Sequence, residues 1–312
     1  MRCYFLALSI LTMAMPLSAQ MCMSPPHATL TTIAYDSALL GMKAPFNIIL
    51  PAGYEQSVRR YPVLLLLHGL WGHYDDWANN TNILEYAGQY PLIVVMPEGG
   101  NGWYTNGVAP NAKWEDYIMK EVMPYVESHY RTLQSRRMWA VAGLSMGGYG
   151  AIKLGLKYHE LFSIAASMSG ALAITEAPDS ELGDPKGVPY ISVHDAFGPQ
   201  GSAARKANAL PTLLESSGVD APFLYLDCGT EDYQYLYEAS RKFSELLQQK
   251  KVPHEYRERP GIHDWDEWDH QIQGVLRLIA ERWHLSWCGD ETPCHLPVRI
   301  ATEGHRVEFG RP

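Results

Sequence analysis

The sequence predicts an α/β fold, with a mostly parallel central sheet flanked by helices. Short apolar runs typical of strands alternate with helical patterns along most of the 312 residues. The run YPVLLLLHG at 61–69 is continuously apolar, which is typical of a strand buried on both faces. Hydrophobic residues make up 46% of the chain and charged residues 19%, the balance of a globular protein rather than a disordered one. We therefore expect one large α/β domain.

The first half of the chain predicts three strands and a helix. Apolar runs at 45–50 (PFNIIL), 61–69 and 91–99 (PLIVVMPEG) give the strands. The segment 114–130 (WEDYIMKEVMPYVESHY) has apolar residues at helical spacing, so we predict a helix there. Pro124 lies inside this helix and is expected to kink or interrupt it, because proline has no N–H to donate.

The second half continues the alternation. We predict strands at 138–143 (MWAVAG), 162–170 (FSIAASMSG), 222–229 (PFLYLDCG) and 254–259 (HEYRER), and helices at 148–158, 235–250 and 266–283. The segment 171–220 is the exception, because it is rich in Pro, Gly, Asp and Ser and predicts no long element. A stretch of this kind in a compact domain is usually a lid or a binding loop, so we expect a lid-like insertion there.

The two ends of the chain differ from its centre. Residues 1–19 indicate a signal peptide, because Arg2 precedes a mostly apolar run at 3–15 and Leu17-Ser18-Ala19 offers a cleavage site. That run is too short to span a bilayer, and no later stretch reaches the length needed. We expect a secreted or periplasmic protein with its main domain over 20–285 and a polar tail over 286–312. The net charge of −9 argues against a nucleic-acid partner.

Four cysteines would remain after cleavage, and an exported protein can keep disulfides. Cys288 and Cys294 bracket a short turn-rich loop and could bridge each other. Cys22 and Cys228 could pair or stay free, and the sequence does not decide between these alternatives. The sequence contains no CxxC motif and no Cys/His cluster, so it does not indicate a zinc site.

The most informative motif is Gly143-Leu144-Ser145-Met146-Gly147, between a predicted strand and a predicted helix. G-x-S-x-G in this context is typical of a nucleophile elbow, a tight turn that exposes the serine at the carboxyl edge of the sheet. Side chains at 143 and 147 would collide with neighbouring backbone in such a turn, so both positions need glycine or a very small residue. We predict Ser145 to be a catalytic nucleophile; the alternative is a serine that merely caps the helix.

A serine nucleophile needs a base, and the base needs a carboxylate to orient it. His263 lies in a loop (PGIHDW, 260–265) before the last predicted helix, so we expect it to be the base, with His270 as its nearest rival. The acid should follow the preceding strand, where LDCGTEDYQ (226–234) offers Asp227, Glu231 and Asp232. We favour Asp232, which lies furthest out on the loop.

Acyl transfer also requires donors for the oxyanion of the tetrahedral intermediate. The backbone N–H of Met146, after the nucleophile, and that of Leu70, in the loop HGLWGHYDDW (68–77), are the expected donors. Four aromatic residues of loops at this edge could line a substrate pocket or pack beneath the loops: Trp71, Trp103, Tyr104 and Trp265. The acidic segment HDWDEWDH (263–270) could suggest a metal, but its carboxylates also suit the first turn of a helix, and we predict no metal site.

Six stretches occur in an order that resembles a known group of enzymes. They are LLLLHGLWGHYDDW, NGWYTN, WEDYIMKEVMPYVE, AGLSMGGYGA, LDCGTEDYQY and GIHDWDEW. The set resembles the esterase D-like branch of the α/β-hydrolases, which includes tributyrin-type and feruloyl esterases, S-formylglutathione hydrolases and the mycobacterial mycolyltransferase antigens. The resemblance covers roughly residues 40–285. It implies the α/β-hydrolase fold, a catalytic domain over 20–285, a triad of Ser145, Asp232 and His263, and no cofactor.

The oxyanion loop departs from one member of this branch. In the S-formylglutathione hydrolases it reads SGL followed by threonine and cysteine, whereas here it reads His68-Gly69-Leu70-Trp71-Gly72. An exported enzyme would also rarely meet glutathione. We therefore expect a carboxylesterase rather than that specialised thioesterase.

The resulting expectation is a secreted serine carboxylesterase that hydrolyses short acyl or hydroxycinnamoyl esters, either of small molecules or linked to carbohydrate. Three alternatives stay open. An acyltransferase of the mycolyltransferase type would use the same triad, with an alcohol outcompeting water. An S-formylglutathione hydrolase-like thioesterase and a non-catalytic binding module are the others. A peptidase is disfavoured, because nothing in the chain resembles the gating domain of the oligopeptidases of this fold.

Overall fold

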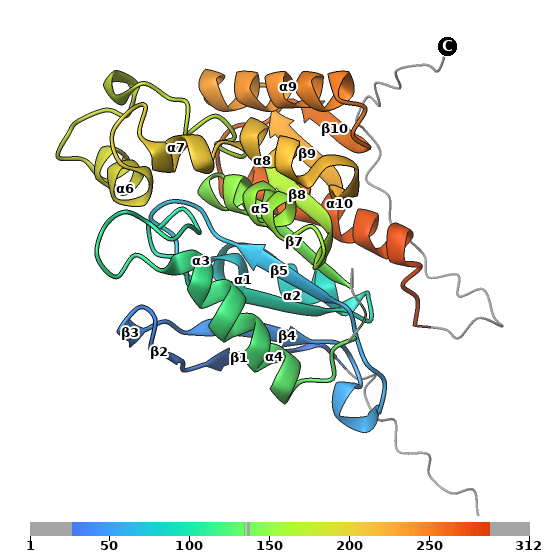
Figure 1. The fold of residues 1–312 in the computed structure, drawn as a ribbon. Coiled ribbons are helices and arrows are strands. Elements are labelled where there is room, and N and C mark those ends of the chain that lie inside the picture. Colours follow the sequence, from blue (N-terminus) through green and yellow to red (C-terminus); the bar gives the residue numbers. More distant parts are fainter. Residues whose placement is uncertain (1–26, 134, 136–137, 288–312) are drawn as a thin grey trace, which may run out of the picture.

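An eight-stranded sheet forms the centre of the computed structural model, which describes residues 27–133, 135 and 138–287 (Figure 1). The strand order is β1-β4-β6-β5-β7-β8-β9-β10. All neighbouring pairs from β6 to β10 are parallel, and β4 runs antiparallel to both of its neighbours, so the predicted mostly parallel sheet is confirmed. The strands are β1 (Thr29–Ile33), β4 (Phe46–Leu50), β5 (Val63–Leu67), β6 (Ile93–Pro97), β7 (Trp139–Leu144), β8 (Phe162–Met168), β9 (Phe223–Gly229) and β10 (His254–Arg259), and a separate hairpin pairs β2 (Asp36–Ser37) with β3 (Met42–Lys43).

Helices cover both faces of this sheet, and the side chains of each strand divide between the two faces. Val63, Leu65 and Leu67 of β5 point into one core, whereas Leu64 and Leu66 point into the other, as the two-residue period of a strand requires. The first core packs against α3 (Trp114–Asp116), α4 (Met123–His129), α5 (Met146–Lys157), α8 (Leu210–Ser217) and α9 (Gln234–Gln249), and the second against α1 (Asp76–Asn80), α2 (Ile83–Gly88) and α10 (Trp265–Trp283). Burial on both faces explains why the β5 sequence is apolar without alternation.

The helix predicted over 114–130 is continuous through Pro124 rather than cut there. Between α3 and α4 the backbone of Tyr117–Val122 winds as a π-helix, and Pro124 lies in the first turn of α4. Proline has no N–H, and its ring clashes with the carbonyl four residues earlier in a regular α-helix. The wider winding just before Pro124 relieves that clash, so the predicted interruption takes the form of a π segment.

The predicted insertion 171–220 contains more regular structure than its composition indicated. It holds the 3₁₀ turns η3 (Asp179–Glu181) and η4 (Gly218–Asp220) and the helices α6 (Val188–Phe197), α7 (Ala203–Ala207) and α8. The buried Arg205 guanidinium ties the segment together by donating to the carbonyls of Gly198 (3.0 Å) and Ala177 (2.7 Å) and pairing with Asp179 (2.6 Å). The longest of these elements, α6, has 10 residues, so the segment is built from short helices rather than a long element, and its role as a lid stays a prediction.

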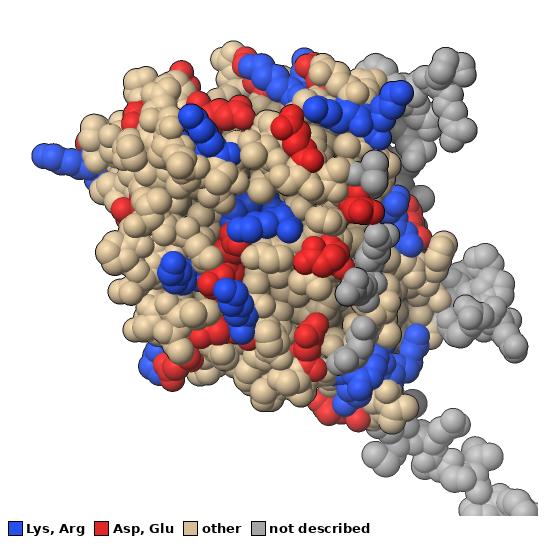
Figure 2. Space-filling model, viewed as in Figure 1, with Lys and Arg blue, Asp and Glu red and all other residues tan. Residues whose placement is uncertain are grey.

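Other predictions concern residues outside the described ones. The signal peptide 1–19, most of the tail 286–312, and Cys22, Cys288 and Cys294 all lie there. Cys228 is buried in β9 as a free thiol. Among the helices that the structure describes, none has the length and apolar character to cross a bilayer. Acidic and basic side chains are interspersed over the face of the molecule that Figure 2 shows.

A buried ion pair fastens the start of α3 to α5. Glu115 and Lys153 are both buried and form a direct ion pair. Glu115 also accepts from the Lys157 ammonium (2.6 Å) and from the Tyr158 hydroxyl (2.7 Å). Burial alone would raise the pKa of Glu115, but these three donors outweigh it and lower the pKa to about 2.

We expect this depressed pKa to make the protein sensitive to acid. The pKa of Glu115 rises from about 2 in the folded chain to an ordinary 4.5 in the unfolded chain, so ionisation of this carboxyl favours the folded state. This stabilisation is fully present above pH 4.5 and is lost as the pH falls through 2. In urea titrations, Glu115→Gln should be less stable than the wild type at pH 6, and the gap should narrow towards pH 3. A gap that stays constant with pH would contradict the assignment.

Candidate active site

Ser145 lies in a strained turn between β7 and α5. Its φ is 52° and its ψ is −116°, a positive φ that a non-glycine residue rarely adopts. A Cβ at position 143 would come within 2.4 Å of the Gly147 carbonyl oxygen, and one at 147 within 2.5 Å of the His68 carbonyl oxygen. Both glycines are therefore required by close backbone contacts, as predicted. Ser145 directly precedes α5, so its hydroxyl lies at the positive end of the helix dipole.

Gly147→Ala is expected to destabilise the protein and to disturb the active-site turn. The new methyl group would lie 2.5 Å from the His68 carbonyl oxygen and 2.7 Å from that of Leu67, and neither backbone group can move without shifting β5. Overpacking of this kind costs about 1–3 kcal/mol or more. Urea denaturation should reveal this loss, and Gly88→Ala, whose methyl group would meet only the Ala28 Cβ at 3.3 Å, should change stability less. Equal stability of the two variants would contradict the argument.

The side chains of Ser145, His263 and Asp232 form one hydrogen-bonded chain. The distance from Ser145 Oγ to His263 Nε2 is 3.0 Å. His263 Nδ1 lies 3.0 Å from Asp232 Oδ1 and 3.1 Å from Oδ2. The Asp232 side chain is fully buried and also accepts from the Tyr233 N–H at 2.6 Å, whereas His263 is 16% exposed. The carboxylate thus holds the Nδ1 side of the ring while Nε2 faces the serine hydroxyl.

Backbone hydrogen bonds join the loop after β9, which carries Asp232, to the loop after β10, which carries His263. Thr230 N–H donates to the Arg259 carbonyl at 2.8 Å, and Glu231 N–H donates to the Gly261 carbonyl at 3.0 Å. These bonds extend the parallel pairing of β9 and β10 beyond the sheet edge. A Cβ at Gly229 would come within 2.2 Å of the Gly261 carbonyl oxygen, so glycine permits this close approach.

The rival candidates for acid and base lie elsewhere. Asp227 is buried beneath the site, where its carboxylate accepts from the Tyr225 hydroxyl at 2.9 Å and from the Gln271 amide at 3.3 Å. Burial raises the pKa of Asp227, so it does not act as an exposed anion. Glu231 points into solvent, and His270 is exposed on α10. Of these candidates, the structure brings Asp232 and His263 together with Ser145.

The predicted oxyanion donors lie in two separate segments, Met146 directly after Ser145 and Leu70 in a loop where a Cβ on Gly69 would come within 3.4 Å of the Ser145 Cβ. Met146 is the first residue of α5, where N–H groups have no partner within the helix. Leu70 follows β5, and among the described residues none accepts a hydrogen bond from its N–H. The loop is held by His68, whose Nδ1 bonds the Gly69 carbonyl (2.7 Å) and whose Nε2 accepts from the Gly99 N–H (2.8 Å).

The four aromatic residues predicted to line a pocket behave differently from one another. Trp71, next to Leu70, is 63% exposed, and its backbone N–H donates to Oδ1 of Asn101 at 2.8 Å. Trp265 is half-buried and packs edge-on against Trp77 and Trp268. Trp103 and Tyr104 are buried among core side chains, with 4% and no exposure, so the pocket assignment is corrected for these two. The sequence could not show this, because their loop folds back under α5.

The acidic segment 263–270 serves the start of α10. Asp264 caps the helix by accepting from the Glu267 N–H at 3.0 Å, and Glu267 pairs with Arg259 at 2.5 Å. Asp269 accepts from the Tyr86 hydroxyl at 2.7 Å. Within the described residues, no group of three His, Cys, Asp or Glu side chains is placed to hold a metal ion.

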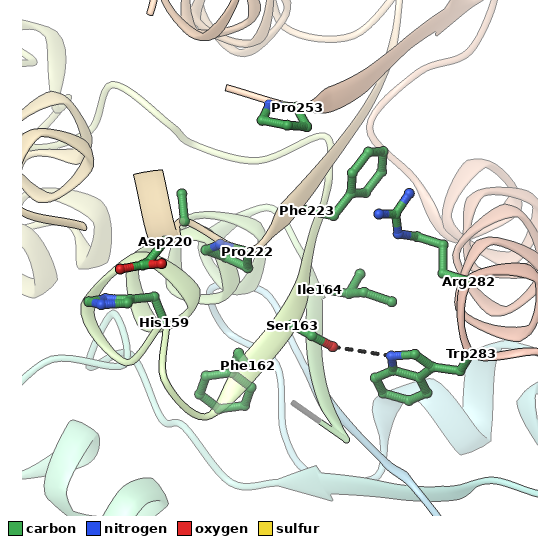
Figure 3. Close-up of a pocket in the computed structure, with 11 residues that line it drawn as sticks. His159, Phe162, Ser163, Ile164, Asp220, Pro222, Phe223, Pro253, Arg282 and Trp283 are labelled. Atoms are coloured by element: carbon green, nitrogen blue, oxygen red, sulfur yellow. Dashed lines mark hydrogen bonds between the residues drawn. The ribbon is translucent and has the colours of Figure 1, made fainter. Parts of the chain in front are cut away.

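A separate pocket of ≈ 390 Å³ has none of the predicted site residues in its wall (Figure 3). It is found where β8 and β9 begin, whereas Ser145 and Asp232 follow the ends of strands, so it opens at the opposite edge of the parallel sheet. Its wall includes the Arg282 guanidinium, 3.6 Å from the centre of the Phe223 ring, and Trp283, whose Nε1 donates to Ser163 Oγ at 3.1 Å. We assign no chemistry to this pocket.

Comparison with known proteins places the chain in a family. The model of the Esterase family matches residues 37–279. An acetyl esterase of Caldicellulosiruptor saccharolyticus is 31% identical over 226 residues, which cover 70% of this chain and 83% of that one. Other matching proteins are named S-formylglutathione hydrolase and mycolyltransferase, as expected for the branch that the sequence resembles.

Solved structures agree with this placement. The fluorophosphonate-binding serine hydrolase FphF of Staphylococcus aureus superposes with a TM-score of 0.72 at 27% identity, covering 81% of this chain and 98% of that one. A ferulic acid esterase superposes with a TM-score of 0.69 at 26% identity, covering 82% and 99%. These neighbours share the α/β-hydrolase fold with the sheet described above. The chain belongs to the Esterase family, and it is a serine hydrolase that acts on carboxylic esters.

Proposed function

We propose that the protein is a secreted carboxylesterase that uses Ser145, His263 and Asp232 as a catalytic triad. The observation that carries the proposal is the unbroken chain from Ser145 Oγ through His263 (3.0 Å) to Asp232 (3.1 Å). Three side chains more than 30 residues apart in sequence meet with the distances and order that a triad needs.

The geometry supports a two-step hydrolysis. His263 Nε2 removes the proton of Ser145 as Oγ attacks the ester carbonyl, and the imidazolium then gives that proton to the leaving alcohol. Water takes the place of the alcohol, His263 removes its proton, and attack on the acyl-enzyme releases the acid and restores Ser145. Asp232 fixes the ring orientation and stabilises the imidazolium in both steps. Leu70 and Met146 would donate their N–H groups to the oxyanion.

The substrate class follows from the surroundings of the triad together with the relatives. Exposed aromatic side chains border the site, namely Trp71 of the oxyanion loop and Tyr233, whose ring centre lies 5.3 Å from that of His263. Flat rings of this kind suit planar acyl groups or the apolar faces of sugars. An acetyl esterase and a ferulic acid esterase are among the relatives. We therefore propose short acyl or hydroxycinnamoyl esters, small or linked to carbohydrate, as substrates.

A panel of esters tests this proposal. Rates would be measured with p-nitrophenyl esters from acetate to palmitate and with methyl ferulate, with glycerol added in a parallel series. We expect turnover of the short esters or of ferulate, with free acid as the product. Turnover limited to long chains would contradict the substrate class, and glycerol esters as the main product would identify an acyltransferase instead.

Secretion is tested separately from activity. If residues 1–19 are a signal peptide, the protein recovered outside the cytoplasm should begin at Gln20. N-terminal sequencing of the exported protein gives the answer, and an intact Met1 in that fraction would contradict the proposal.

A further inference from the structure

We propose that Tyr104 is a positioning residue that holds the oxyanion loop, His68–Gly72, against the turn that carries Ser145. The inference rests on the proposed function, because it concerns the geometry of the oxyanion donors. Tyr104 does not touch the reacting atoms, so its effect must pass through the loop. The contacts of its hydroxyl, its ring and its backbone each contribute to this conclusion.

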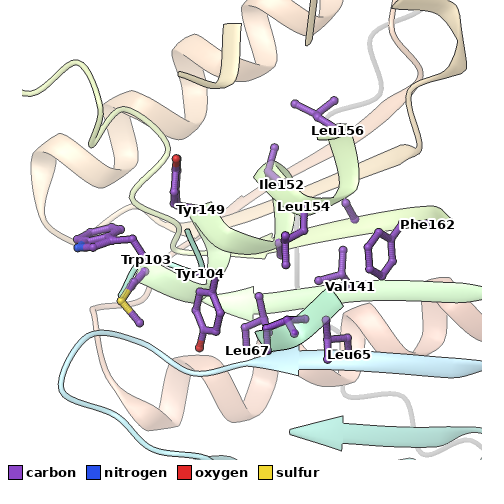
Figure 4. Close-up of a cluster of buried hydrophobic side chains, with 14 of the residues drawn as sticks. Leu65, Leu67, Trp103, Tyr104, Val141, Tyr149, Ile152, Leu154, Leu156 and Phe162 are labelled. Carbon is purple, nitrogen blue, oxygen red and sulfur yellow. The ribbon is translucent and has the colours of Figure 1, made fainter. Parts of the chain in front are cut away.

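The hydroxyl of Tyr104 bonds directly to the base of the oxyanion loop. It donates to the His68 carbonyl oxygen at 3.0 Å, and the two rings pack edge to face with centres 5.8 Å apart. Tyr104 has no exposed surface, and it lies in the core near Leu67, the last residue of β5 (Figure 4). Because the bond is shielded from water, its loss would leave a buried carbonyl without this partner.

Two glycines make room for the Tyr104 ring. A Cβ at Gly99 would lie 2.5 Å from the ring, and so would one at Gly150 of α5. The ring is therefore clamped between the loop after β6 and the helix that begins after Ser145. A ring packed so closely on both sides can fix the position of the loop relative to α5, because neither neighbour can move without moving the ring.

The backbone at Tyr104 is strained and anchored. Trp103 and Tyr104 have φ values of 53° and 50°, a region that non-glycine residues adopt only at a cost in free energy. The buried Lys153 ammonium donates to the Tyr104 carbonyl at 2.8 Å and pairs with Glu115. Strain of this kind persists only where the surroundings enforce it, and here a buried ion pair does so.

The His68 carbonyl is the point where this arrangement meets the catalytic turn. A Cβ on Gly147 would come within 2.5 Å of this same oxygen, so the loop is in close contact with the serine turn. Leu70 is two residues beyond His68 along the chain. A shift of His68 therefore changes the position of the Leu70 N–H relative to Ser145.

Tyr104→Phe, compared with Tyr117→Phe, tests the proposal. Tyr117 is an apt control because it is also fully buried and its hydroxyl also donates to a backbone carbonyl, that of Ala44, at 2.7 Å. Both variants should lower the melting temperature by similar amounts. Tyr104→Phe alone should lower kcat for p-nitrophenyl acetate, by about tenfold or more but by less than the ~100- to 1000-fold loss of a whole oxyanion donor. Acylation and deacylation both pass through an oxyanion, so both should slow together and leave KM nearly unchanged.

The rate of phosphonylation by a fluorophosphonate gives a second readout. This reaction also develops negative charge on an oxygen in the oxyanion site, so Tyr104→Phe should slow it and Tyr117→Phe should not. If both variants keep the same kcat and the same phosphonylation rate, Tyr104 is structural only and the inference is overturned. Should Tyr104→Phe fail to fold, the double variant Lys153→Met/Glu115→Gln replaces it. A fall in kcat at unchanged KM is expected there too, and wild-type kcat would overturn the inference.

This outcome is separable from that of the proposed function. If Ser145→Ala abolishes activity and Tyr104→Phe does not lower it, only the inference about Tyr104 is wrong. If Ser145→Ala keeps its activity, the proposed triad itself is wrong.

Discussion

Ser145→Ala is expected to lower kcat for ester hydrolysis by about a million-fold, the loss typical of a serine nucleophile. Without the hydroxyl no acyl-enzyme can form, and His263 has no group at 3.0 Å from which to take a proton. The residual rate would come from the oxyanion donors alone. The measurement is kcat for p-nitrophenyl acetate, with protein free of contaminating esterase.

Ser167→Ala provides the matched control for this prediction. Ser167 is a buried serine on β8, paired in register with Gly143 of β7, and has no place in the proposed mechanism. It should keep activity within a few-fold of the wild type, and Ser145→Ala should keep the wild-type circular dichroism spectrum. Hydrolysis by Ser145→Ala at the rate of the Ser167→Ala variant would show that another group is the nucleophile.

Asp232→Asn is expected to lower kcat by about ten-thousand-fold while leaving the fold intact. The carboxylate is fully buried, so its charge acts on His263 with little screening by water. An amide has nearly the same shape but can present its NH₂ group to Nδ1, which favours the wrong tautomer of the ring. Stabilisation of the imidazolium is lost as well.

Glu231→Gln and Asp227→Asn test whether the effect is specific to Asp232. Glu231 is one residue away but points into solvent, and its substitution should leave kcat unchanged. Asp227 is buried with Tyr225 and Gln271, so its substitution should alter stability more than kcat. A loss for Glu231→Gln as large as that for Asp232→Asn would contradict the assignment of the acid.

The parts of the structure that sequence reasoning reached are those that depend on close neighbours in the chain. The β5 run from Val63 to Leu67 reads as a doubly buried strand because no side chain in it can face water. The elbow at Ser145 could be recognised because Gly143 and Gly147 follow from the backbone geometry of a single turn. In both cases the physical cause lies within a few residues.

The parts that sequence reasoning missed depend on contacts between distant segments. The strand β1 (Thr29–Ile33) is largely exposed at the edge of the sheet and has no apolar run, so only its pairing with β4 reveals it. Short helices in 171–220 have little periodicity, although Pro189 and Pro211 near the starts of α6 and α8 are typical helix-start signals. The burial of Tyr104 depends on glycines in two other segments and on Lys153.

The choice of Asp232 over its neighbours shows the same division. The sequence has three carboxylates close together, Asp227, Glu231 and Asp232, and each of them is a candidate for the acid on sequence alone. What decides between them is the loop pairing of Glu231 N–H with the Gly261 carbonyl, which sets Asp232 facing His263 and Glu231 facing solvent.

The most direct test of the account is to locate the covalent adduct formed by a fluorophosphonate. The intact protein would be treated with the probe and its mass measured, and the modified peptide would then be sequenced by mass spectrometry. We predict one adduct per chain, on Ser145, with labelling greatly slowed in His263→Ala. An adduct on a different residue, or full esterase activity in protein that takes up no probe, would contradict the claim that Ser145, activated by His263, is the nucleophile.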